Sequence, residues 1–235
     1  MKAWVFVEGR SDVLGLESLW KSWRNRLREK RHGLAVIPLD TKSNLLKKLG
    51  HRAAEKLVGN DSDLVVGLPD LYPIRAFEGT DFAHTDASSL KQFQRSSVRD
   101  ALVSTFQLSR TKADHCMTRF LPAVFKHDFE MLLLAAKDAL RIALGTNDRL
   151  GNWRVPVEDQ NLDQPPKRVI EDLFRTKSPS RRRYLDTRDA PKILGSVTDL
   201  GAILRTDSGV VTCREFVEVL RWLGDRFGEP CCALP

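Results

Sequence analysis

Two carboxylates of the chain stand directly after unbroken apolar runs. Glu8 follows Trp4–Val7, and Asp70 comes shortly after Leu64–Leu68. A further acid, Asp12, lies four residues beyond Glu8. Carboxylate oxygens are the ligands that Mg²⁺ and Mn²⁺ prefer, and these ions activate water and neutralise charge in phosphoryl transfer. The spacing therefore predicts a metal-dependent site in which Glu8, Asp70 and Asp12 are the candidate ligands.

A third polar group follows the apolar segment 120–125. It consists of His127, Asp128 and Glu130. An acid before a helix often serves as its N-cap, so Asp12 and Asp128 each keep a capping role as the alternative. A single histidine is more often a hydrogen-bonded core residue than a metal ligand. Glu130 lies in an apolar stretch, where a carboxylate without a partner is costly, so we expect a functional or paired role for it.

Strand and helix signals alternate along the first part of the chain. Alternation of this kind is typical of βαβ units, and it predicts an α/β fold with a mostly parallel sheet flanked by helices. In such open sheets, functional residues gather at the carboxyl ends of the strands. The predicted strands are 4–7, 34–39, 64–68 and 120–125, and the predicted helices are 12–31, 45–57, 88–106 and 129–144.

The character of the sequence changes after Gly145. The next twenty residues are polar and contain prolines, and short helical patterns follow at 169–174, 191–204 and 213–227. We therefore expect a catalytic core over residues 1–145 and a small helical C-terminal extension over 146–235, packed on that core.

The chain is basic, with a formal net charge of +7. Such a charge favours a polyanionic partner, of which nucleic acid is the commonest. Three arginines follow one face of the predicted helix 12–31, and three more form a basic loop, although surfaces of this kind are often merely solvated. The candidates for contacting a phosphate backbone are Arg24, Arg28, Arg31, Arg181, Arg182 and Arg183.

The sequence also argues against several classes of protein. No apolar run approaches the roughly 20 residues that a membrane-spanning helix needs, and the N-terminus lacks the pattern of a signal peptide. The four cysteines form no C-x-x-C pair, which argues against a zinc site. These features predict a cytoplasmic protein without a membrane partner.

Several motifs resemble those of a known fold family. Val5–Asp12 resembles the first motif of TOPRIM domains, the topoisomerase–primase fold, and Leu64–Pro73 stands where that fold carries its Asp-x-Asp motif. More specifically, Asp70–Tyr72, Pro122–Glu130 and Ala190–Gly195 resemble signature segments of bacterial TOPRIM-like proteins. Those proteins tend to be encoded beside AAA- or ABC-type ATPases in phage-defence and mobile islands.

The resemblance implies a Mg²⁺-dependent phosphoryl-transfer site. It makes Glu8 and Asp70 metal ligands, His127 and Glu130 signature residues of the site, and Lys192 a charge-neutralising group. Together these five residues are the catalytic candidates. The implied fold is a TOPRIM-like parallel sheet flanked by helices.

Three functions follow from the sequence, and a nuclease acting on DNA or RNA is the leading one. This nuclease would be the effector of an anti-phage or toxin-type system with an ATPase partner. The sequence leaves a homodimer open as its oligomeric state. The second is a catalytically silent binding module that docks on an ATPase, because Tyr72 replaces the second acid of the Asp-x-Asp motif. The third, primase-like nucleotidyl transfer, ranks last, because the chain lacks the additional domains expected for primer synthesis.

Overall fold

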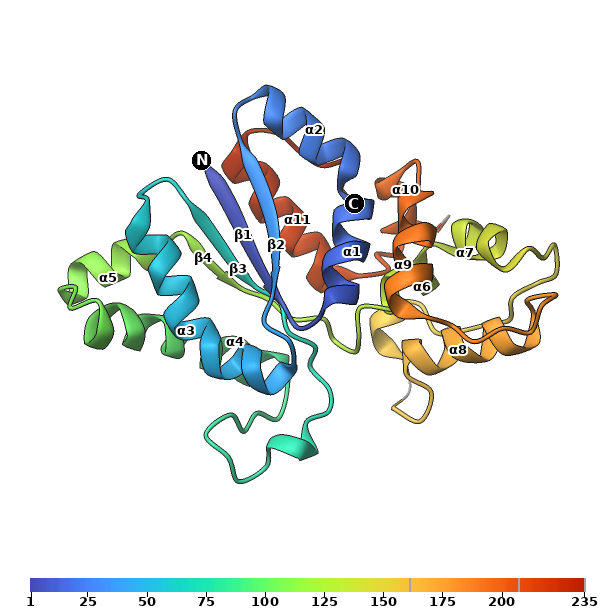
Figure 1. Cartoon of the computed structure of the whole chain (residues 1–235), viewed down its shortest axis with the longest axis horizontal. Helices are drawn as coiled ribbons and strands as arrows, with labels where there is room; N and C mark the ends of the chain where they lie inside the picture. Colours follow the sequence, from blue (N-terminus) through green and yellow to red (C-terminus); the bar gives the residue numbers. More distant parts are fainter. Residues whose placement is uncertain (161, 207, 235) are drawn as a thin grey trace. The chain divides into compact units, whose positions relative to one another are not determined.

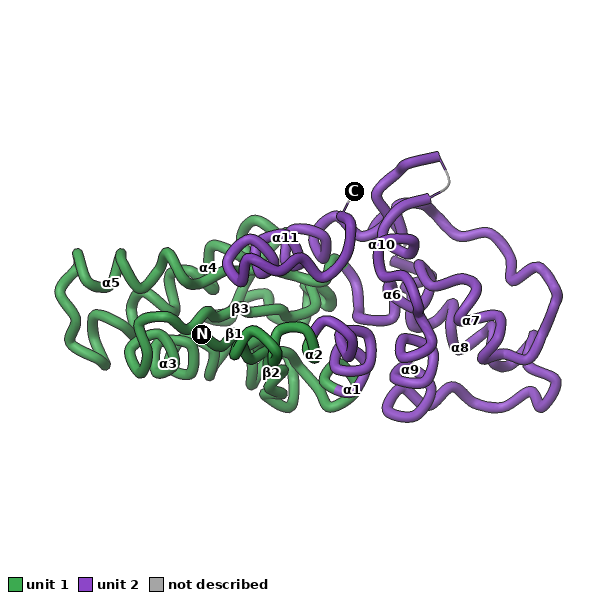
Figure 2. Tube along the Cα trace, turned by 90° about the horizontal axis from the view of Figure 1, so that it is seen from above, with its two compact units in different colours: residues 1–13, 24–126 green, residues 14–23, 127–235 purple. Residues whose placement is uncertain are grey.

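The computed structural model describes residues 1–160, 162–206 and 208–234. The chain forms two compact units, drawn in different colours in Figure 2. The first unit contains residues 1–13 and 24–126, and the second contains residues 14–23 and 127–235. These units do not coincide with the division at residue 145 that we expected from the sequence.

The first unit is built around a four-stranded, all-parallel sheet (Figure 1). Strands β1 (Lys2–Val7), β2 (Gly33–Pro38), β3 (Leu64–Gly67) and β4 (Phe120–Pro122) lie in the order β2-β1-β3-β4. The predicted α/β fold with a parallel sheet flanked by helices is confirmed. Pro38 ends the edge strand β2, where a residue without a backbone N–H removes no ladder bond from a neighbour.

Two long helices cover the sheet within this unit. Helix α3 (Lys42–Gly59) connects β2 to β3, and α4 (Ala87–Asp100) lies beside it on the way to β4 (Figure 1). Their apolar faces form one buried core with the sheet residues Phe6 and Val65. The rest of the connection comprises a 3₁₀ turn (Arg75–Phe77), a π-helical turn (Ala101–Thr105) and α5 (Arg110–Met117). The π-helical turn continues α4 to the end of the predicted helix 88–106, whereas the sequence did not predict the 3₁₀ turn or α5.

The end of β3 is packed too closely for any residue larger than glycine. A Cβ atom at Gly67 would lie 2.3 Å from Gln94 Oε1 and 2.8 Å from a methyl group of Leu49. Gln94 is fully buried and donates through Nε2 to the backbone carbonyl of Ala123 at 2.9 Å. Gly67 therefore lets α3 and α4 approach the strand just before the loop that carries Asp70.

The second unit is helical. Its longest helix is α11 (Arg214–Phe227), which the sequence predicted within one residue. The other elements are α1 (Arg10–Leu19), whose first turn belongs to the first unit, α6 (Met131–Ala135), α7 (Lys137–Leu144), a 3₁₀ turn (Val157–Asp159), α8 (Pro166–Thr176), α9 (Asp186–Gly195) and α10 (Leu200–Ile203).

Two predicted long helices are each broken in the structure. The predicted helix 12–31 was wrong as a continuous element, because the chain turns at Trp20 between α1 and α2 (Lys21–Glu29). Trp20 is fully buried and its ring stacks on Phe216 at 5.9 Å, so the turn places this large side chain in the core of the second unit.

The predicted helix 129–144 is also interrupted. Ala136 takes φ −85° and ψ 53°, outside the helical region, and separates α6 from α7. Met131, Leu132, Leu133 and Leu134 of α6 are buried, but Ile142 in α7 is 75% exposed. The predicted continuous helix 129–144 was therefore wrong, because a buried helix and a partly exposed helix take its place.

No helix in the described residues is both long enough and apolar enough to cross a membrane.

Candidate functional site

The first group of acids meets where the strand order reverses. The chain passes from β1 to β2 on one side and then to β3 on the other side of β1. Glu8 directly follows β1, and Asp70 follows β3. The backbone N–H of Asp70 donates to Glu8 Oε1 at 3.0 Å. The two acids are thus in contact at the place where open α/β sheets bind their ligands.

Backbone pairing holds the Asp70 loop against the segment that follows β4. Leu71 donates its N–H to the Phe125 carbonyl at 2.7 Å, and Phe125 donates to the Pro69 carbonyl at 2.9 Å. Asp70 and Phe125 form a parallel bridge beyond the ends of the named strands. The loop is therefore fixed on both sides of Asp70, which limits the freedom of its carboxylate.

Asp12 acts at the N-terminus of α1. Its Oδ2 accepts from the backbone N–H of Gly9 at 2.9 Å, the return bond of a capping box. This geometry supports the capping role for Asp12 that the sequence left open beside the ligand role. Gly9 itself has an ordinary φ, and a Cβ there would meet only Ser11 Oγ at 3.6 Å, so this turn does not require glycine.

A buried lysine that the sequence did not single out completes this group. Lys42 is 6% exposed and donates through Nζ to the carbonyls of Leu71 and Pro73. It also lies 3.1 Å from Nε2 of His84, whose Nδ1 faces the Phe82 carbonyl at 2.8 Å. Nε2 of His84 also lies 3.1 Å from the Leu71 carbonyl, so Lys42 and His84 meet at the same oxygen.

The position of Lys42 could have been inferred from the sequence, although its contacts could not. Thr41 caps α3 by accepting from the backbone N–H of Asn44, so Lys42 stands in the first turn of the helix that follows β2. That position lies at the carboxyl edge of the sheet in any βαβ unit. His84 lies in an irregular segment, and no periodicity points to it.

Burial sets the electrostatics of this group. Desolvation raises the pKa of Glu8 to about 7, with a smaller upward effect from Asp12, while the backbone N–H of Asp70 and the charge of Lys42 act against it. Desolvation likewise lowers the pKa of Lys42 to about 8, opposed by Glu8 and Asp70. The fold therefore keeps a carboxylate and an ammonium partly desolvated at a solvent-reachable edge, a feature typical of functional sites.

The raised pKa of Glu8 predicts a pH dependence of stability. Between its ordinary pKa of 4.5 and about 7, the folded protein binds a proton at Glu8 that the unfolded chain releases. Stability contributed by this group is present below pH 4.5 and falls as the pH rises to about 7. In metal-free buffer, we expect wild type to lose up to about 3 kcal/mol relative to Glu8→Gln over this window, measured by urea unfolding. A constant difference between the two proteins would contradict this assignment.

The donor set fits a hard divalent cation. Glu8 and Asp70 offer carboxylate oxygens, and Mg²⁺ is commonly held by one or two carboxylates together with water and substrate oxygens. In the described part of the chain, no three side chains of the His, Cys, Asp or Glu type are grouped as a ready-made metal site. A metal here would therefore depend on water and a bound phosphate for its remaining ligands.

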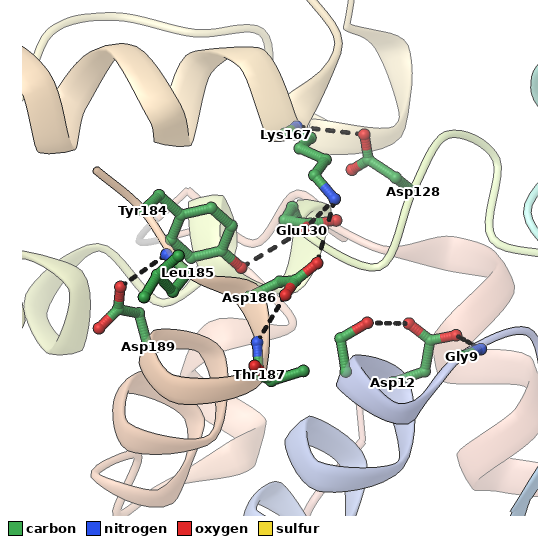
Figure 3. A network of polar contacts seen from close by, with 11 residues as sticks. Gly9, Asp12, Asp128, Glu130, Lys167, Tyr184, Leu185, Asp186, Thr187 and Asp189 are labelled. Atoms are coloured by element: carbon green, nitrogen blue, oxygen red, sulfur yellow. Dashed lines mark hydrogen bonds and ion pairs between the residues drawn. The ribbon is translucent and has the colours of Figure 1, made fainter.

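A second polar group lies in the second unit (Figure 3). Tyr184 donates its hydroxyl to Glu130 Oε1 at 3.3 Å, and Lys167 Nζ lies 3.6 Å from the same oxygen and 3.3 Å from Asp186 Oδ2. Glu130 is 4% exposed and precedes α6, so the prediction that it lies inside a helix was wrong. The expectation that its carboxylate is paired is met.

Desolvation lowers the pKa of Lys167, but the negative charges around it have the greater effect and raise this pKa. Among these charges, Glu130 contributes most. Asp128 adds to this group in an unexpected way. Its Oδ2 accepts from the backbone N–H of Lys167 at 3.1 Å, in the first turn of α8 (Figure 3). Burial raises the pKa of Asp128 to about 6, against the opposing effect of this bond. The group thus connects three segments that are far apart in sequence.

The other predicted site residues also belong to the second unit. His127 is buried in the turn before α6, where no helix has begun, so it does not share a helical face with Glu130. Lys192 is exposed on α9. The predicted site residues therefore lie in both units, with Glu8, Asp12 and Asp70 in the first and His127, Glu130 and Lys192 in the second. Their roles stay predictions.

The predicted arginine surfaces are only partly formed. Arg31 lies beyond the end of α2 with φ 59°, so the expected stripe with Arg24 and Arg28 does not continue to it. Arg182 pairs with the buried Asp189 at 2.7 Å and lies over the Phe174 ring at 4.5 Å, which is a structural role. Arg181 and Arg183 are exposed and stay candidates.

The fold and the acids define the class: an α/β protein in which Glu8 and Asp70 follow neighbouring strands at the switch point of a parallel sheet, with the Glu8 carboxylate bonded to the Asp70 backbone. A family model described as "Domain of unknown function (DUF4276)" matches residues 8–204. The chain therefore belongs to the DUF4276 family, and the match includes both polar groups. No match was found among curated proteins or among solved structures.

Proposed function

We propose that this protein hydrolyses phosphodiester bonds in nucleic acid with Mg²⁺ or Mn²⁺ held at Glu8 and Asp70. The observation that carries the proposal is the contact between these two acids at the switch point, where Glu8 Oε1 accepts from the Asp70 N–H at 3.0 Å. Oxygen ligands meeting at this edge suit a cation that binds a phosphate.

Four residues of the chain would have separate roles in this reaction. The Glu8 and Asp70 carboxylates would hold the ion, which when bound supplies charge neutralisation and an activated water. Lys42 would fix the Asp70 loop through the carbonyls of Leu71 and Pro73 and would add a positive charge close to both acids. Asp12 would keep the start of α1 in place behind Gly9.

The setting of this activity is part of the proposal. The TOPRIM-like motifs and the four-stranded parallel sheet are in accord with each other. They support a cytoplasmic nuclease that works as the effector of an anti-phage or toxin-type system beside an AAA- or ABC-type ATPase. The net charge of +7 suits a nucleic-acid substrate.

A cleavage assay tests the proposal. Purified protein should cut at least one of tRNA, single-stranded DNA and double-stranded DNA when Mg²⁺ or Mn²⁺ is present, and EDTA should stop the reaction. Asp70→Asn should be inactive on the same substrate, because the amide oxygen is a poorer ligand for a hard cation. Cleavage that continues at full rate in EDTA would reject the metal-dependent mechanism.

A second candidate is a catalytically silent module that docks on an ATPase. Two observations favour it: Tyr72 in the position of the second acid, and burial that raises the pKa of Glu8 to about 7 and so weakens its charge. Tight association with an AAA- or ABC-type ATPase, together with no metal binding at Glu8 and Asp70, would favour this function over hydrolysis.

A further inference from the structure

We propose that a single strand of nucleic acid lies along one side of α3, in a groove that no sequence motif marked. This α3 groove is formed by residues 38–40 at the end of β2 and by Lys47, Lys48, His51 and Arg52 of α3. Its volume is about 520 Å³. The identification of the bound molecule as nucleic acid rests on the proposed function. The inference adds the surface on which that molecule binds.

The α3 groove begins beside the candidate site within the same unit. The N–H of Leu39, on its rim, donates to the carbonyl of Val7 at 2.9 Å, and Val7 is the residue before Glu8. Helix α3 starts at Lys42 and runs from this edge. At a rise of about 1.5 Å per residue, Arg52 lies about 15 Å along the helix from Lys42. A nucleic-acid strand bound in the α3 groove would thus lead to the carboxylates of Glu8 and Asp70.

The charge of the α3 groove suits a phosphate backbone. Lys47, Lys48 and Arg52 are exposed and carry three permanent positive charges, whereas Asp40 is the single acid among the lining residues. Lys48 lies 3.6 Å from Asp40, and Arg52 lies 3.2 Å from Glu55. Exposed ion pairs of this kind are weak and exchange readily, so both cations can turn to a phosphate.

The ring of His51 favours single-stranded nucleic acid, whose bases are unpaired. It stacks on Phe106 with ring centres 5.5 Å apart and planes 27° apart, while the residue itself is exposed. Bases of single strands stack on aromatic platforms of this kind, independently of sequence.

Binding measured without catalysis tests the α3 groove. Fluorescence anisotropy with a labelled 12-nucleotide single strand in EDTA should show about a 10-fold higher Kd at about 0.15 M salt for the double variant Lys47→Gln/Lys48→Gln. The slope of log K against log salt should fall by about 1.4, since each lost contact with a single strand removes about 0.7. The double variant Arg110→Gln/Lys112→Gln, with the same charge change on exposed residues of α5, should keep the wild-type Kd and slope.

A second variant separates stacking from charge. His51→Ala should weaken binding of the single strand roughly 5-fold or more, and it should leave binding of an abasic oligonucleotide of equal length unchanged. The proposal that a single strand binds in the α3 groove is rejected by any of three results. These are a wild-type Kd for the α3 variants, an equal loss of affinity in the α5 control, and binding of duplex alone. Binding along α3 without metal-dependent cleavage would reject the proposed function and leave the α3 groove standing.

Discussion

Glu8→Gln is expected to lower metal-dependent cleavage by about 10²–10³-fold while the protein stays folded. Losing one group that stabilises transition-state charge has an effect of this size. The glutamine Oε1 can still accept from the Asp70 N–H, which wild-type Glu8 accepts at 3.0 Å, so the loop geometry is retained. Because the carboxylate is partly desolvated, the neutral side chain should not lower the melting temperature at pH 8. Single-turnover cleavage rates and melting curves of both proteins check this result.

Glu78→Gln is the matched control for this variant. Glu78 is exposed at the end of the 3₁₀ turn in the same unit, and its replacement makes the same change in charge. We expect it to cleave at the wild-type rate. Equal cleavage by Glu8→Gln and Glu78→Gln would show that the carboxylate of Glu8 has no part in the reaction.

Lys42→Met is expected to reduce both stability and cleavage. The methionine fills a similar volume but removes the ammonium that donates to the carbonyls of Leu71 and Pro73 and lies 3.1 Å from Nε2 of His84. Each buried polar group that loses its partner costs about 1–3 kcal/mol, so we expect a loss of about 2–4 kcal/mol in the free energy of unfolding. For a chain of this length, that loss lowers the melting temperature by roughly 5–12 °C.

The effect on cleavage follows from the loop that Lys42 holds. Since Leu71 is next to Asp70, release of its carbonyl should displace the Asp70 carboxylate, and cleavage should fall at least about 10-fold below the melting range. Lys112→Met, on an exposed residue of α5, should change neither quantity. A melting temperature within 1 °C of wild type for Lys42→Met would contradict the assigned role of Lys42.

The sheet and the first acid pair followed from local patterns. Short apolar runs that end in acids mark the carboxyl ends of parallel strands, and parallel topology brings those ends to one edge. The sequence therefore predicted that Glu8 and Asp70 would lie close together, and they are in contact. Pro38 lies at the end of the edge strand β2, where proline is tolerated.

Tertiary contacts explain what the sequence did not reveal. Trp20 and Ala136 interrupt helices whose apolar periodicity continues through the break, because packing of the second unit overrides local propensity. Lys42 gains its importance from carbonyls 29 and 31 residues away, which no pattern within α3 records. Arg182 resembles a basic surface residue in the sequence, yet its partner Asp189 is buried.

Binding of Mn²⁺ is the most direct test of the central claim that Glu8 and Asp70 hold a catalytic metal. Electron paramagnetic resonance can count bound Mn²⁺ in wild type, Glu8→Gln and Asp70→Asn, with Glu78→Gln as the control. The claim predicts that wild type and Glu78→Gln bind the ion, that Mg²⁺ displaces it, and that the other two variants lose it. Equal Mn²⁺ binding by all four proteins, or none by wild type in the presence of the nucleic acid, would contradict it.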